Sequence, residues 1–191
     1  MRRILASIGI VGVCLFWIGA ATYINLATQV KGTLPVANGG TGVTSFTVPQ
    51  VQYLNANTGT SATNTLVNSG MSFTIAANTV YTLDCGIIFT VSTTSGVGLT
   101  LGVNGPGTPT EVTLMREINT TATAFRIDSS QGTAWAAKVG ATATTVTGLA
   151  MAHFYGLIEN GSTAGTLAIQ YANIGTTGTV ILDRGSWCKL Q

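Results

Sequence analysis

Between Val51 and the C-terminus, apolar and polar residues alternate along the chain in short runs. The clearest run extends from Tyr81 to Val91, where every second side chain is apolar or aromatic. A period of two residues indicates a strand that buries one of its faces. We therefore predict a half-buried strand here, preceded by a short strand at 72–75 and a turn at Asn78.

Similar runs follow at short spacing and are separated by Gly, Asn and Pro. The predicted strands are residues 99–103, 111–118, 124–128, 133–139, 149–158, 166–172, 179–182 and 186–190. Short strands joined by Gly-rich turns are typical of an antiparallel sandwich. The predicted fold class is all-β, a jelly-roll sandwich head that occupies residues 51–191.

The run from Leu149 to Ile158 differs from the others because it is apolar on both faces. One face of such a strand fills the core, and the other face needs a second cover. That cover is either a neighbouring subunit at a threefold axis or a loop of the same chain. In the first interpretation, Met151, Phe154 and Tyr155 belong to a trimer interface.

The first 21 residues form an apolar leader. Arg2 and Arg3 are followed by an uncharged run from Ile4 to Ala21. This pattern fits a cleaved signal peptide, and the run is also just long enough to span a bilayer as a retained helix. Packing against copies of itself is a third interpretation. We predict an N-terminal apolar helix and treat residues 4–21 as a candidate membrane contact.

Residues 22–50 form a predicted extended linker. Pro35 excludes a helix, and the Asn38-Gly39-Gly40 sequence marks a tight turn. Leu34 and Val36 point to the same side of an extended chain. In a lone chain both side chains would face water, whereas around a threefold axis they would bury one another. We therefore assign Leu34 and Val36 to the trimer interface.

The linker sequence Gly32–Gly42, GTLPVANGGTG, closely resembles a segment that recurs in tail fibre and other virion proteins of tailed bacteriophages. Segments 165–172 and 185–190 are similar to the end of phage fibre and spike heads. They are more loosely similar to the trimeric jelly rolls of the tumour necrosis factor and C1q type. The resemblance implies a homotrimeric structural protein on the exterior of a phage particle.

This resemblance also implies partners, which are further copies of the chain, other virion proteins and a host surface glycan or protein. One feature departs from the family pattern. Phage structural proteins are usually assembled in the cytoplasm, so an apolar leader is unexpected in one. Two other interpretations therefore stay open: a passive capsid or tail decoration protein without a receptor, and an exported bacterial surface protein.

The composition favours a permanent oligomer. Only 7% of the residues are charged, against roughly 25% in ordinary soluble domains, so an isolated surface would be poorly protected against association. From Gly32 onward five basic residues accompany six acidic ones. Without a basic patch the chain has nothing to attract phosphates, so we exclude nucleic acid as a partner.

Little in the sequence points to catalysis. His153 is the one histidine, and its apolar neighbours favour a packed core or interface residue over a catalytic base. Metal-ligating residues do not cluster in the sequence. We expect no enzymatic activity, no metal and no cofactor. Cys85 and Cys188 either form a disulfide or are two buried thiols.

Three turns are candidates for receptor contact, at 104–109, 129–132 and 160–165. The candidate receptor-binding residues in them are Asn104, Pro106, Ser129, Gln131, Asn160 and Ser162. Loops that are polar but uncharged suit the hydroxyl groups of a sugar. Trp135 either stacks on a sugar ring or lies in the core.

Overall fold

A computed structural model describes residues 48–59, 63–92, 97–120, 124–135, 137–140, 148–175 and 178–191. The predicted leader, most of the predicted linker, and the interface residues Leu34 and Val36 lie outside these ranges. Among the residues described, no helix is long and apolar enough to span a bilayer. Thr47–Gln191 forms one compact unit.

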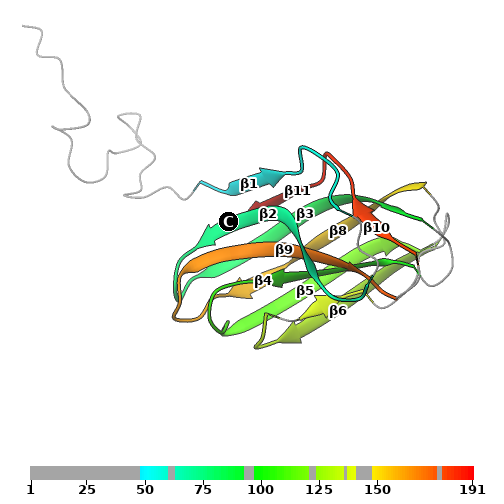
Figure 1. Cartoon of the computed structure of the whole chain (residues 1–191). Coiled ribbons are helices and arrows are strands. Elements are labelled where there is room, and N and C mark those ends of the chain that lie inside the picture. The colour runs from blue at the N-terminus through cyan, green and yellow to red at the C-terminus, as the bar shows by residue number, and fades with distance from the viewer. Residues whose placement is uncertain are drawn as a thin grey trace, which may run out of the picture. The chain divides into compact units, whose positions relative to one another are not determined.

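Two antiparallel sheets face each other in this unit (Figure 1). The larger sheet has the order β1-β11-β3-β8-β5-β6, with β10 also paired to β3, and the smaller sheet has the order β2-β9-β4-β7. The strands are β1 Gln50–Tyr53, β2 Val67–Ile75, β3 Val80–Val91, β4 Leu99–Asn104, β5 Glu111–Asn119, β6 Phe125–Gly132, β7 Lys138–Val139, β8 Gly148–Glu159, β9 Gly165–Asn173, β10 Val180–Leu182 and β11 Trp187–Leu190. The all-β sandwich predicted from the alternating pattern is confirmed.

The strand pairs are nested in the sequence. β1 pairs with β11, β2 with β9, β3 with β8, β4 with β7, and β5 with β6. Such nesting results when one long antiparallel ribbon, closed at the β5–β6 hairpin, wraps around a common core. The hairpin then folds back, so that β5 also pairs with β8 and β6 forms the edge of the larger sheet.

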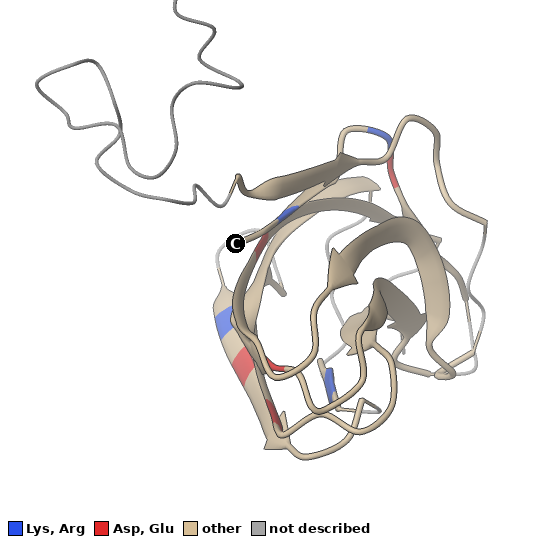
Figure 2. Cartoon of the chain, turned by 90° about the vertical axis from the view of Figure 1, so that its left-hand side faces the viewer, with Lys and Arg blue, Asp and Glu red and all other residues tan. Residues whose placement is uncertain are grey.

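Alternation along the strands separates the core from the surface. In β3 the side chains of Leu83, Ile87 and Phe89 point inward and are at most 2% exposed. Leu101 of β4 and Ile169 of β9 are fully buried from the smaller sheet. Charged residues are few on the ribbon (Figure 2). The core is therefore almost wholly apolar.

The same alternation corrects the prediction for Phe154 and excludes one of the two alternatives for His153, the core position. Phe154 is fully buried in the core, so the structure does not place it in an interface with Met151 and Tyr155. Its neighbour His153 lies on the outer face with 48% of its side chain exposed, and is not a core histidine. Successive residues of a strand point to opposite faces, and Phe154 shares its face with Ala152.

Two further segments differ from the prediction. Ser129 and Gln131 lie in β6, opposite Met115 and Thr113, and not in a turn. In the segment 133–139, only Lys138–Val139 is a strand within the described residues. The pairing with β5 extends β6 beyond the apolar residues that the sequence pattern detects.

Cys85 and Cys188 form a disulfide in the core. The two residues are directly opposite each other in β3 and β11, with Cα atoms 4.1 Å apart. Because the two cysteines are 103 residues apart in the chain, the sequence alone could not show whether they form a disulfide. The antiparallel register decides it in favour of the disulfide.

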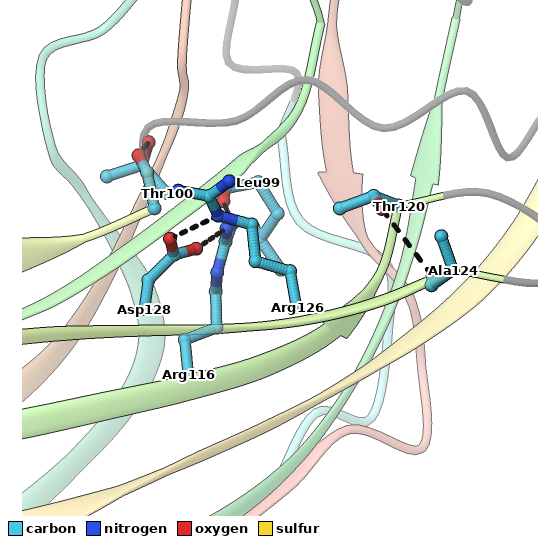
Figure 3. Close-up of polar contacts among 8 residues, drawn as sticks. Leu99, Thr100, Arg116, Thr120, Ala124, Arg126 and Asp128 are labelled. Carbon is cyan, nitrogen blue, oxygen red and sulfur yellow. Dashed lines mark hydrogen bonds and ion pairs between the residues drawn. The ribbon is translucent and has the colours of Figure 1, made fainter.

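A charged side chain is also buried inside the sandwich. Arg116 of β5 is fully buried, and it donates hydrogen bonds to the Leu99 carbonyl oxygen and to the Asp128 carboxylate (Figure 3). Asp128 also accepts a hydrogen bond of 2.8 Å from Arg126 Nε. Burial lowers the pKa of Arg116 below its ordinary value, although the hydrogen bond and the negative charge of Asp128 act to raise it. Since Leu99 belongs to β4, this contact ties the β5–β6 hairpin to the smaller sheet.

Candidate interaction surface

The outer face of the larger sheet carries apolar side chains from four strands. We call this set the apolar face; it consists of the exposed residues Tyr53, Phe125, Ile127, Leu149 and Met151 and the half-buried Trp187. Leu149 and Met151 of β8 are 68% and 63% exposed. Exposed apolar side chains that stand alone are normal on a protein, but a contiguous set marks an interaction surface.

The register of the sheet explains why these residues gather. One row of directly opposed residues crosses six strands: Tyr53, Trp187, Gly86, His153, Glu117 and Ile127. Residues that are directly opposite point to the same face of the sheet. Ile88 is opposite Met151 in an adjoining row, and Asn119 is opposite Phe125. The alternating pattern of each strand therefore produces a continuous surface.

An open hollow of about 390 Å³ lies within the apolar face. Its lining residues are Gly86, Glu117, Asn119, Phe125, Met151, Ala152, His153 and Trp187. A Cβ atom at Gly86 would be 2.6 Å from Trp187 Nε1. The indole therefore lies directly against the backbone of β3, and only glycine leaves room for it.

A polar network lies in the middle of the apolar face. His153 Nε2 is 2.8 Å from Asp84 Oδ1, and His153 Nδ1 is 3.7 Å from Glu117 Oε2. Tyr155 donates a hydrogen bond of 2.8 Å to Glu117 Oε1, and this bond raises the pKa of Tyr155. The ring of Tyr155 stacks on that of His153. The lining of the hollow contains no Ser, Thr, Cys or Lys that could act as a nucleophile beside His153.

The predicted receptor turns at 104–109 and 160–165 meet at one end of the sandwich. A Cβ atom at Gly161 would be 2.1 Å from the Thr108 carbonyl oxygen. Asn104 and Ser162 are exposed there and Pro106 is half-buried. Asn160 is buried, and its amide donates hydrogen bonds to the carbonyl oxygens of Ala76 and Thr163. Its side chain therefore holds the loop together from inside.

A second hollow, of about 470 Å³, lies on the outer side of the smaller sheet. Its lining residues are Asn64, Thr65, Leu66, Asn104, Trp135, Lys138 and Gln170. Trp135 is 7% exposed, and its Nε1 donates a hydrogen bond to the Pro106 carbonyl oxygen at 3.1 Å. Most of its ring is in the core, as one of the two interpretations of Trp135 expected.

Sequence reasoning identified only Asn104 and Trp135 among these lining residues. Asn64, Lys138 and Gln170 are far apart in the chain. The pairing of β4 with β7 and β9 brings Lys138 and Gln170 together, and Lys138 Nζ contacts the Asn64 carbonyl oxygen. No local sequence signal marks them as a group. Within the described ranges, no three His, Cys, Asp or Glu side chains could together hold a metal ion.

Comparison with known proteins identifies no family. No protein-family model and no curated protein matches the chain. A solved structure, "Structure of infectious bursal disease virus Gx strain", is weakly similar, with 15% sequence identity and a TM-score of 0.19. The match covers 84% of this chain and 43% of the other, so the chain spans less than half of that protein. A similarity of this strength carries no functional argument.

Proposed function

We propose that this chain is a structural bacteriophage virion protein, a homotrimeric fibre or spike whose head contacts the host surface. The apolar face is the observation that supports this most directly. Leu149, Met151, Phe125 and Ile127 are each more than half exposed in the single chain. Burying such side chains against another copy is favourable by about 25 cal/mol per Å² of apolar surface. The phage assignment rests on the resemblance of the linker sequence.

The nested strand pairs favour a jelly roll for the head. When β10 and the β5–β6 hairpin are set aside, eight strands remain in two four-stranded sheets. Counted along the chain, these strands have the orders 1-8-3-6 and 2-7-4-5. Eight strands in two sheets with nested pairs are the jelly-roll arrangement. Because the similar heads of the tumour necrosis factor and C1q type are trimers, we expect three copies.

The number of subunits can be measured on the full chain. The protein is purified in mild detergent and its mass is determined by native mass spectrometry, which removes the detergent. We expect three times 19.6 kDa. In the trimer Met151 should be protected from oxidation by hydrogen peroxide, because the apolar face is covered. A monomer with rapidly oxidised Met151 would contradict the proposed function.

A pair of variants tests the face itself. Leu149→Glu places a charge in the apolar face next to Met151, so Met151 should oxidise faster even if the N-terminal segment still holds the copies together. Thr166→Glu is the matched control, because Thr166 is an exposed strand residue on the smaller sheet. Equal oxidation of Met151 in the two variants would show that the face is not the interface.

A second candidate function is an exported bacterial surface protein with the same trimeric head. The Cys85–Cys188 disulfide favours it, because disulfides form and persist outside the reducing cytosol. An apolar leader of the signal-peptide type agrees with export. Fractionation distinguishes the two: a virion protein co-purifies with phage particles, whereas an exported protein is found in the cell envelope or the medium without them.

A further inference from the structure

We infer that the hollow on the smaller sheet, lined by Asn64, Thr65, Leu66, Asn104, Trp135, Lys138 and Gln170, is a saccharide-binding site with a preference for acidic sugars. The inference rests on the proposed attachment function and gives that function a site and a ligand class. Its volume of about 470 Å³ lies in the range of ordinary ligand pockets.

The lining offers unused hydrogen-bonding groups. In the described part of the chain, the side-chain amides of Asn64 and Asn104 and the hydroxyl group of Thr65 make no hydrogen bond. Gln170 donates one from Nε2 to Asn68 Oδ1, at 2.9 Å, which leaves its oxygen free to accept. Amides present donors and an acceptor side by side. Neighbouring hydroxyl groups of a sugar require the same combination.

Leu66 and the exposed part of Trp135 supply an apolar wall. Gly102 of β4 lets Leu66 approach the backbone of the smaller sheet, and Gly105, directly after β4, lets the Trp135 ring approach the backbone there. A Cβ atom at Gly102 would be 2.8 Å from Leu66 Cδ1, and one at Gly105 would be 2.5 Å from Trp135. The C–H face of a sugar ring packs against such a wall while its hydroxyl groups bind the amides.

Lys138 gives the hollow its charge. Its Nζ donates a hydrogen bond of 3.2 Å to the Asn64 carbonyl oxygen, which is neutral, and no carboxylate lines the hollow. The ammonium charge is therefore available to a carboxylate on the ligand. A uronic acid unit combines that carboxylate with the hydroxyl groups and the C–H face that the other residues require.

The position of the hollow agrees with assembly through the apolar face. It is built on β4, β7 and β9 of the smaller sheet, whereas the apolar face belongs to the larger sheet. The two surfaces are on opposite sides of the sandwich. Three copies joined through the apolar face would therefore display three open hollows, and multivalent binding would strengthen weak single contacts.

The test uses the full chain and a printed array of neutral, N-acetylated and uronic acid-containing oligosaccharides. We expect binding to members with uronic acid. Asn104→Ala and Gln170→Ala should each weaken binding about three- to tenfold, as loss of one or two hydrogen bonds does. Lys138→Gln should reduce the preference for acidic over neutral sugars. Gln52→Ala, an exposed amide of β1 outside the hollow, is the matched control.

Two results would overturn the inference: no binding to any saccharide on the array, or binding that none of the hollow variants changes. Neither result depends on the subunit number. A trimer that binds no saccharide would contradict the saccharide site and favour the passive decoration protein. A monomer that binds uronic acid through Lys138 would support the site and contradict the proposed assembly.

Discussion

Removal of the Cys85–Cys188 disulfide should lower the stability of the head substantially. The bond closes a loop of 103 residues between β3 and β11, so in the unfolded state it restricts the part of the sandwich from β3 to β11. The chain-entropy relation assigns about 4.7 kcal/mol to a loop of roughly this length. Measured values for disulfides are typically about 2–4 kcal/mol. We therefore expect a loss of about 2–5 kcal/mol on reduction.

The measurement compares oxidised and reduced protein in urea at one chain concentration, since assembly also affects apparent stability. Tryptophan fluorescence, to which Trp187 beside Cys188 contributes, reports the unfolding. Cys14→Ala serves as the background, because it removes the third thiol and prevents exchange. In this background, alkylation in denaturant should modify neither remaining cysteine before reduction and both cysteines after it.

Two outcomes would refute the reasoning. If both cysteines are alkylated before reduction, they are the pair of buried thiols that the sequence also allowed. If the disulfide is present but both forms unfold at the same urea concentration, the entropy argument fails. A Cys85→Ala/Cys188→Ala variant is a weaker test, because both side chains are fully buried and their truncation also leaves a cavity.

Three other changes test the core. Phe154→Ala should destabilise the head by about 3–5 kcal/mol in urea, because the ring is fully buried; a loss near zero would place the ring on the surface. Gly156→Ala should lower the melting temperature, because a Cβ atom there would be 2.1 Å from the Thr113 carbonyl oxygen. Burial works against ionisation of Asp128, but hydrogen bonds from Arg126 and Arg116 lower its pKa below the ordinary value. The ionised group therefore contributes stability that is present above the ordinary pKa and lost as the pH falls through the lowered one. Asp128→Asn should accordingly melt earlier than the wild type near neutral pH, and this difference should shrink in strong acid.

The period-two pattern predicts those features of the fold that depend on one strand at a time. The run predicted at 149–158 is β8, Gly148–Glu159, and the faces of β3 agree residue by residue with the alternation. The position of Phe154 in the core follows from the same rule. The interface prediction did not separate the two faces of the apolar run. Phe154 is an even number of residues from the buried Ala150 and Ala152, so it lies on their face of the strand.

Features that depend on pairs of strands could not be read from the sequence. β6 continues to Gly132 because it hydrogen-bonds to β5, although Ser129, Ser130 and Gln131 are not typical strand residues. The hollow on the smaller sheet combines residues from the segment 63–66 with β4, β7 and β9. Register and long-range pairing decide such groupings, and neither has a local sequence signal.

The polar network of the apolar face bears on how copies of the chain could meet. Carboxylates become costly when a surface is covered, unless they remain paired. Asp84 is paired with His153, and Glu117 accepts a hydrogen bond from Tyr155, so the chain satisfies one oxygen of each carboxylate by itself. A neighbouring copy must leave the other oxygens in water or offer them a donor. The apolar side chains would then supply the area of the contact, while the network would select its orientation, because a rotated copy would cover Asp84 or Glu117 with apolar groups alone.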